Sequence, residues 1–209
     1  MDPSSRADRG MNASDGNPAR LLLALDQRLD HAVRLILYGR SAVWLGFDNP
    51  PPATAVTQDV DCIIPEAEVR SLAEDMQFWD ARDAVNQSLK PAGLYLTHLF
   101  PETEVFLRTD WLAHLVPITC LPFRHLRLFR PATLDLILTK MMRGKDAQDM
   151  ADVEFMIRRD GVTERALHDA FARMKPIRLA ERREAFDTAK PIVLGLARAA
   201  ARSRTGQAH

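Results

Sequence analysis

The stretch that most constrains the fold is residues 33–46, VRLILYGRSAVWLG. Its apolar run, interrupted only by Arg34, predicts a buried strand that ends in a tight turn and is followed by a helix. Gly39 allows the chain to turn sharply and lets backbone N–H groups approach a ligand. Ser41 is placed either to cap the next helix or to hydrogen-bond a phosphate oxygen. The stretch therefore predicts a strand–turn–helix unit suited to binding phosphate.

A second strand is predicted over residues 57–64, where carboxylates stand two positions apart at Asp59 and Asp61. Alternate side chains of a strand point to the same face, so both carboxylates are expected to leave one face together. The other, packed face is expected to carry Val60, Cys62 and Ile64.

Two like charges held this close repel each other unless a cation sits between them. Mg²⁺ (or Mn²⁺) is the expected cation, because Mg²⁺ prefers oxygen ligands and bridges carboxylates to substrate phosphates. A glycine–serine turn near a metal-binding carboxylate pair is the equipment of phosphoryl or nucleotidyl transfer. The alternative is a strand end whose two Asp residues are merely solvated.

Together the two motifs resemble the nucleotidyltransferase (DNA polymerase β-like) superfamily, whose signature is Gly-Ser, a helix and then D-x-D on the next strand. Within it, the chain resembles AbiEii-like and related bacterial proteins, which carry G-G-[ST]-A and then R-x-T-x-D-x-D. Residues 39–42 read GRSA, with Arg where a second Gly is usual, and residues 55–61 read AVTQDVD, with Ala where Arg is usual. The resemblance implies an α/β (α+β) fold, a mixed sheet flanked by helices with a C-terminal helical region.

The resemblance also implies roles for these residues. Asp59 and Asp61 would be catalytic metal ligands, and Gly39, Arg40 and Ser41 would bind the nucleotide. The implied reaction moves a nucleotidyl group from a nucleoside triphosphate to a hydroxyl of RNA (tRNA) or protein, with Mg²⁺ as cofactor. The implied setting is a toxin-like activity in a bacterial toxin–antitoxin or phage-defence system, with an antitoxin partner.

The superfamily usually adds a third carboxylate from a later strand of the same sheet, and three acids are candidates. Glu104 fits best as a catalytic metal ligand, because it is the first residue of Glu104–Leu107, in which the acid is followed by strand-forming residues. Glu102 lies in a predicted turn, and Asp110 is expected to be a helix N-cap.

A third motif, residues 135–149, resembles the D-x-x-x-x-K and K-D-x-x-D elements of AbiEii-like proteins. The resemblance implies that Lys140 contacts a nucleotide phosphate, with Arg143 as a second contact. A lysine suits this role as a mobile point charge. Asp146 and Asp149 are additional candidates. The alternatives are a solvated helix face for Lys140 and N-terminal helix acids, favourable against the helix dipole, for the two Asp residues.

The chain is expected to have three parts: a polar, disordered leader over residues 1–16, a nucleotidyltransferase-like α/β core over 17–130 and a C-terminal helical region over 131–209. The other elements expected at the start of the core are a helix over 17–30, a loop over 48–54 and a helical region over 65–89, in which Phe78-Trp79 marks either a bend or a second helix. A hairpin of strands 94–100 and 104–108 and strands over 115–120 and 125–129 are expected to follow. The C-terminal helices are expected over 131–144, 147–159, 163–174 and 179–201, with Pro191 as a candidate break point and a frayed tail over 203–209.

Composition limits the class of protein. The chain of 209 residues is 46% hydrophobic and has zero formal net charge. Residues 1–153 carry 16 Lys and Arg against 21 Asp and Glu, whereas residues 154–209 carry 12 against 7, so an acidic lobe precedes a basic one. Two cysteines make no disulfide framework, and no segment has the apolar core of a signal peptide or the length of a membrane span. We expect a cytoplasmic protein with no membrane partner.

Three functional interpretations stay open from the sequence alone. The first is the enzyme described above. The second is a catalytically inactive protein of the same fold that binds nucleotide or RNA, favoured by Arg40 and Ala55. The third is an interaction module whose basic C-terminal helices bind RNA or a partner. The arginines that would serve it, unless they are ordinary solvated helix charges, are Arg178, Arg182, Arg183, Arg198, Arg202 and Arg204.

Overall fold

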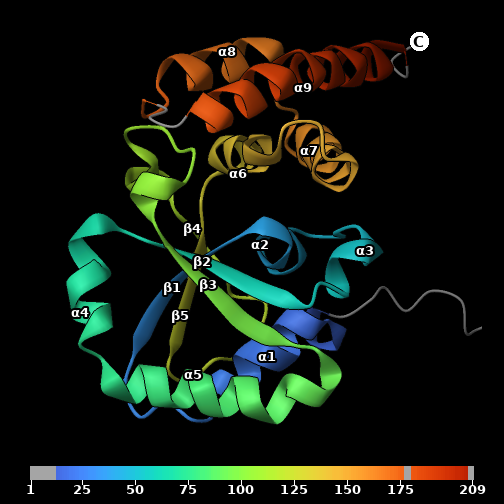
Figure 1. The fold of residues 1–209 in the computed structure, drawn as a ribbon. Helices are drawn as coiled ribbons and strands as arrows, with labels where there is room; N and C mark the ends of the chain where they lie inside the picture. Colours follow the sequence, from blue (N-terminus) through green and yellow to red (C-terminus); the bar gives the residue numbers. More distant parts are fainter. Residues whose placement is uncertain (1–12, 177–179, 207–209) are drawn as a thin grey trace, which may run out of the picture.

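The computed structural model describes residues 13–176 and 180–206 and shows a mixed sheet with helices packed around it (Figure 1). The sheet has the strand order β3-β2-β1-β5-β4. Its strands are β1 (Val33–Tyr38), β2 (Asp59–Ile64), β3 (Tyr95–Pro101), β4 (Val116–Pro117) and β5 (Leu126–Arg130). The expected mixed α/β fold class is confirmed.

Strand β1 lies at the centre of the sheet, as its nearly continuous apolar run predicts. It pairs antiparallel with β2 and parallel with β5, while β2 pairs parallel with β3 and β5 pairs antiparallel with β4. In this register Tyr38 lies opposite Asp61. The turn at Gly39, which follows β1 directly, therefore stands beside the carboxylates of β2.

Side-chain alternation divides the core between the two faces of the sheet. Leu37 and Cys62 belong to the larger cluster, which the helices on one face complete. Ile36 and Ile63 belong to a second cluster, which includes Trp111 from the chain after β3. The helices of this cluster that pack on the strands are α1 (Asn17–Asp26), α2 (Gly39–Gly46) and α5 (Met76–Leu89). The sheet is thus covered by helices on one face and by an irregular segment on the other.

A helical lobe lies beyond one end of the sheet, at the top of Figure 1. Its helices are α6 (Thr133–Lys140), α7 (Ala147–Asp160), α8 (Glu164–Ala172) and α9 (Ala180–Gly206). Helix α7 packs on both α6 and α9. Gly144 and Gly161 end the helical segments before them with φ of +67° and +64°, a conformation that favours glycine. Within the described ranges, none of the helices has the length and apolar composition needed to cross a bilayer.

The remaining elements are short. They are the helices α3 (Pro52–Ala55) and α4 (Val69–Ala73), and the 3-10 turns Ala13–Asp15, Glu66–Glu68, Lys90–Ala92, Glu102–Glu104, Trp111–His114 and Met141–Arg143. The division of the chain into a core and a C-terminal region at residue 130 stays a prediction.

The prediction of a hairpin formed by strands 94–100 and 104–108 is wrong. Residues 104–108 do not pair with β3, which instead lies parallel to β2. After the 3-10 turn Glu102–Glu104 the chain runs to the helical lobe, where the N–H of Lys175 donates to the carbonyl of Leu107 at 2.9 Å. This path buries Leu107 with Trp111 on the second face of the sheet. Burial there outweighs the local preference for a hairpin.

Two other boundaries also differ from expectation, and a third agrees with one of two alternatives. The predicted loop over 48–54 contains the start of α3, because a proline is tolerated in the first turn of a helix. The helical region after β2 divides before Met76, and Phe78 and Trp79 lie in the first turn of a second helix, α5, as one of the two alternatives predicts. The Asp75 carboxylate caps α5 by accepting the N–H of Phe78 at 3.0 Å. Helix α9 continues through Pro191, where burial of residues such as Val193 offsets the lost hydrogen bond.

Parts of the expected disordered leader and of the expected frayed tail have regular structure. Residues 1–12 of the expected leader and residues 207–209 of the expected tail lie outside the described residues. Residues 13–15 form a 3-10 turn, and the carbonyl of Ala13 accepts the indole N–H of Trp44 at 3.0 Å. Residues 203–206 are helical and belong to α9. Helix α1 ends at Asp26, four residues before the predicted end.

Asp26, the last residue of α1, holds the start of β5. Its buried carboxylate accepts the backbone N–H groups of Arg124, His125 and Leu126 at 2.9, 2.8 and 2.7 Å. Burial raises the pKa of Asp26, but the backbone donors outweigh burial, so the pKa lies below its ordinary value. This carboxylate therefore joins two elements that are 100 residues apart in the sequence.

We expect Asp26→Ala to lower the free energy of unfolding by about 3 kcal/mol, because buried N–H donors lose a charged acceptor. Urea denaturation would record a lower midpoint with an unchanged slope. Glu66→Ala, at an exposed carboxylate, is the control and should stay within about 0.5 kcal/mol of the wild type.

The pH dependence of the same variant gives a second readout. Because the pKa of Asp26 is lower in the folded protein, its stabilisation is complete above the unfolded pKa of about 4 and is lost as the pH falls through the folded pKa. The stability gap between the wild type and Asp26→Ala should therefore shrink from about pH 5 downwards. A gap that stays constant in acid would contradict the role given to this carboxylate.

Candidate active site

The turn after β1 brings backbone groups close to a carboxylate. Gly39 has a φ of +65°, and a Cβ built on it would lie 3.7 Å from Asp61 Oδ2, so the backbone passes close to this side chain. Helix α2 begins here with Tyr38 as its N-cap, and the described residues provide no side-chain hydrogen bond to the cap. The first N–H groups of α2 are thus available to an anion.

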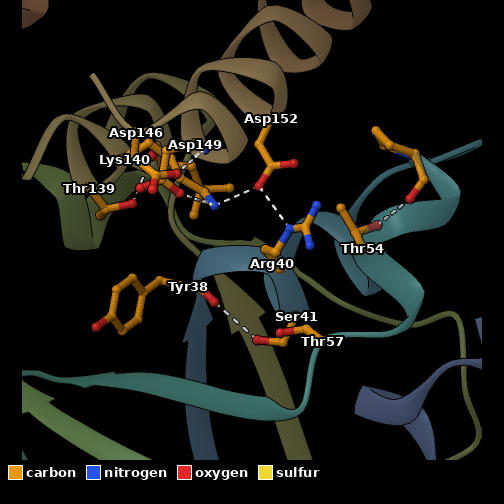
Figure 2. Close-up of polar contacts among 12 residues, drawn as sticks. Tyr38, Arg40, Ser41, Thr54, Thr57, Thr139, Lys140, Asp146, Asp149 and Asp152 are labelled. Atoms are coloured by element: carbon orange, nitrogen blue, oxygen red, sulfur yellow. Dashed lines mark hydrogen bonds and ion pairs between the residues drawn. The ribbon is translucent and has the colours of Figure 1, made fainter. Parts of the chain in front are cut away.

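Ser41 does not take either of its predicted roles in this structure. Its side chain is buried, and its hydroxyl donates to the carbonyl of Tyr38 at 3.0 Å (Figure 2). Because Ser41 is the third residue of α2, its hydroxyl points back into the first turn. This hydrogen bond stabilises the turn, and Ser41 does not line the neighbouring cavity.

Asp59 and Asp61 leave the same face of β2, as their spacing predicts. Both line one cavity, while Val60 between them is buried in the core. Thr57 Oγ1 donates to Asp59 Oδ1 at 2.8 Å, and Thr97 Oγ1 of β3 lies 3.5 Å from Asp61 Oδ1. The two carboxylates are therefore held by hydroxyl groups at the end of the sheet.

The cavity has a volume of about 600 Å³ and lies between the sheet and the helical lobe. Its sheet side is formed by Tyr38, Gly39, Arg40, Val56, Thr57, Gln58, Asp59, Asp61 and Phe100. Its lobe side is formed by Thr139, Lys140, Met142, Arg143, Gln148, Asp149 and Arg182. The structure thus gathers most of the predicted site residues, from three separate motifs, around one space.

Lys140 is buried in the lobe wall between two carboxylates. Its Nζ lies 2.8 Å from Asp149 Oδ1 and 2.6 Å from Asp152 Oδ2, and 5% of the residue is exposed (Figure 2). The expectation of a solvated helix face for this lysine is therefore wrong. A buried ammonium needs such partners, because an unpaired charge in the interior costs several kcal/mol.

Arg40 links the turn to the lobe. Its Nε lies 3.4 Å from Asp152 Oδ2, and with the Gln148 amide oriented to satisfy both groups, the amide oxygen accepts from the guanidinium. The side chain of Arg40 is 15% exposed and lines the cavity. Asp152 thus contacts cations from two different elements, α2 and α6.

The acids of the K-D-x-x-D motif have distinct roles. Asp146 caps α7 by accepting the N–H of Asp149 at 2.9 Å, as the helix-acid alternative predicts, and does not line the cavity. Asp149 is buried and contacts both Lys140 and Arg143, the latter with an Nε–Oδ2 distance of 2.5 Å. Burial raises the pKa of Asp149, but the two cations outweigh it, and the pKa is lowered.

Glu104 is not brought to the Asp pair. It is exposed, lies in the 3-10 turn after β3 and does not line the cavity. Glu102 is buried and accepts the indole N–H of Trp111 at 2.6 Å, and Asp110 contacts His114 at 3.0 Å. In the part of the chain that the structure describes, no three His, Cys, Asp or Glu side chains are grouped to hold a metal. The chain leaves the sheet too early for a third strand carboxylate.

The sequence analysis did not place two residues at the site: Asp152, which contacts the lining residues Lys140 and Arg40, and Arg182, which lines the cavity itself. Asp152 follows Asp149 by three positions, so both carboxylates lie on one face of α7. This spacing was readable, although the partner on α6 was not. Arg182, grouped with the arginines for nucleic acid, lines the cavity from the first turn of α9. Only the docking of α9 on the lobe reveals its place.

Asp135, the first acid of the third motif, has a structural role. It is fully buried, and its Oδ2 lies 2.7 Å from Nη2 of Arg108, while its Oδ1 accepts the backbone N–H of Arg108 at 2.9 Å. The pair fixes the segment after β3 to the start of α6. It does not reach the cavity.

The uncapped start of α2, the Asp pair on β2 and the cations of the lobe surround one cavity. This combination is that of a nucleotidyltransferase-like domain. A family model described as nucleotidyltransferase of unknown function (DUF6036) matches residues 19–174. The chain belongs to this family, and its match spans the sheet, the Asp pair and the first three helices of the lobe. Comparison with curated proteins and with solved structures gave no match.

We expect Asp152→Ala to lower the free energy of unfolding by at least about 3 kcal/mol, because it leaves Lys140 short of a buried partner. Chemical denaturation would measure the loss. Glu154→Ala on the same helix removes an exposed ion pair with Arg158 and is the matched control, with an expected change below about 0.5 kcal/mol. Equal effects of the two substitutions would show that the Lys140 cluster adds nothing to stability.

Proposed function

We propose that this protein is a Mg²⁺-dependent nucleotidyltransferase that moves a nucleotidyl group from a nucleoside triphosphate to a hydroxyl of RNA or protein. The observation that carries the proposal is the placement of Asp59 and Asp61 around one cavity with Arg40, Lys140 and Arg143. Two carboxylates together with several cations suit a polyphosphate with a bound divalent cation. Family membership supports the reaction class.

Asp59 and Asp61 are the residues that would hold the metal. Their oxygen donors are the kind that Mg²⁺ prefers, and Mg²⁺ usually uses one or two carboxylates, leaving its other positions to water and substrate phosphates. The chain therefore needs no third carboxylate such as Glu104 for the donor set to fit. When bound, the ion would neutralise negative charge on the phosphates and orient them.

The turn and the lobe would hold the polyphosphate. The uncapped N–H groups at the start of α2 are suited to phosphate oxygens. Lys140 has three N–H donors, of which Asp149 and Asp152 accept two, so one is left for a phosphate in the cavity. Arg143 lines the same wall and adds a second positive charge. These groups would stabilise the pyrophosphate that leaves as the acceptor oxygen bonds to the α-phosphorus and the acceptor proton passes to water.

The biological setting is part of the proposal. The resemblance of the three motifs to AbiEii-like proteins supports a toxin activity in a toxin–antitoxin or phage-defence system, with tRNA or a protein as acceptor. Such a toxin would require an antitoxin partner.

We expect the purified protein to transfer label from at least one α-labelled nucleoside triphosphate to total RNA or to lysate protein when Mg²⁺ is present. Asp61→Asn should reduce transfer by about 100-fold or more, since it removes a charge aimed at the reacting group. Asp80→Asn, at an exposed carboxylate on α5, is the control and should retain full activity. Transfer that persists in Asp61→Asn or in EDTA would rule out the assigned metal site.

A second candidate function is nucleotide binding without catalysis. It is favoured by Arg40, which stands where the motif usually has Gly and whose side chain occupies the cavity wall against Asp152. The guanidinium could either contact a phosphate or obstruct it.

We expect Arg40→Gly to weaken the binding of nucleoside triphosphate with Mg²⁺ by about 10-fold, because a charge-assisted contact is lost. Isothermal titration calorimetry would measure it, with Arg158→Ala as an exposed control. Tighter binding by Arg40→Gly would mean that Arg40 obstructs the cavity, and the non-catalytic function would then take first place.

A further inference from the structure

Arg182 brings a cation to the cavity from the C-terminal helix. It lies in the first turn of α9, and its side chain lines the cavity together with Asp59 and Asp61. Its guanidinium donates to the carbonyl oxygen of Glu104, and Nη1 lies 3.8 Å from Met142 Sδ. Because the family match ends at residue 174, this cation comes from a part of the chain beyond the match.

The contacts of Arg182 differ from those of the other cations around the cavity. Lys140, Arg40 and Arg143 each contact a carboxylate. Within the described chain, Arg182 contacts a carbonyl oxygen and a thioether, and neither carries a charge. A guanidinium has five N–H donors and matches the geometry of phosphate. The contacts of Arg182 therefore leave its charge to be compensated by an anion in the cavity.

The charges of Arg182 and Asp61 both influence the pKa of the Tyr38 phenol. Burial and the charge of Asp61 raise the pKa of Tyr38, while the charge of Arg182 acts in the opposite direction. Tyr38 also lines the cavity. Because Arg182 and the Asp pair line this same cavity, the cation faces the space in which the Asp pair would hold a metal–phosphate complex.

Packing of α9 holds this residue in place. A Cβ on Gly144 would lie 3.6 Å from the Cα of Ala185, so the turn after α6 packs closely on α9. Phe186 is buried and meets the ring of Phe106 edge-on at 5.9 Å. Arg182 lies about one turn before these anchors, so its backbone is fixed before any ligand arrives. A pre-positioned charge binds an anion with little loss of freedom.

We propose that Arg182, on the lobe side of the cavity, binds a phosphate group of the nucleoside triphosphate whose metal ion the Asp pair would hold. The inference rests on the proposed function. It makes the C-terminal helix a part of the nucleotide site, in place of the nucleic-acid contact expected from its arginines.

The test measures binding of inorganic pyrophosphate and of each of the four common nucleoside triphosphates, with Mg²⁺, by isothermal titration calorimetry. Arg182→Ala should weaken binding of the triphosphate and of pyrophosphate by about 10- to 100-fold. Arg182→Lys should recover part of the loss, because lysine keeps the positive charge but lacks the planar, bidentate donors of a guanidinium. Arg183→Ala removes the same charge from the next residue, which faces a different surface hollow, and should bind like the wild type.

The outcomes separate this inference from the proposed function. Wild-type affinity in Arg182→Ala, or an equal loss in Arg183→Ala, would overturn the inference and leave the nucleotidyltransferase proposal standing. Failure of the wild type to bind any triphosphate would overturn both. Arg182→Gln, which keeps the β- and γ-methylenes and an N–H donor but removes the charge, serves as the second variant if Arg182→Ala melts at a lower temperature than the wild type, and it should show the same loss of affinity.

Discussion

The buried ammonium of Lys140 is the interaction on which the shape of the site depends. An interior charge is tolerated only with close counter-charges, and Asp149 and Asp152 supply them at 2.8 and 2.6 Å. Because the lysine ends α6 and both acids belong to α7, the contact sets how these helices pack. Asp152 also contacts Arg40, so one carboxylate ties the lobe to the turn that follows β1. A cluster placed for stability thereby shapes the cavity.

The sheet contributes the other half of the site through its register. Tyr38 pairs with Asp61, and the next residue, Gly39, turns with a positive φ that brings the backbone past that carboxylate. A shift of one residue would turn both carboxylates of β2 into the core. The buried Val60 and Cys62 oppose such a shift, because it would expose them to water. Hydrophobic burial therefore fixes the position of the charged groups.

Sequence patterns predicted the local parts of this arrangement. The bounds of β1, the glycine turn and the shared face of Asp59 and Asp61 all follow from alternation and glycine chemistry, which act over a few residues. Glu104 was misplaced because it lies in a 3-10 turn, and the segment after it pairs with a distant part of the chain, where Arg108 forms a bridge to Met174. The hydroxyl of Ser41 turned inward because a nearby carbonyl was available, which a motif alone does not reveal.

The C-terminal contribution to the cavity has a consequence for synthesis. The ribosome makes the Asp pair about 120 residues before Arg182, an interval of roughly 6 to 24 s at ordinary elongation rates of about 5–20 residues per second. During this time the sheet can fold while the cavity still lacks the cation that α9 contributes. A nascent chain would then lack a complete nucleotide site until its last helix docks. For the toxin activity proposed above, such a delay would keep nascent chains without full activity until α9 has been made and has docked.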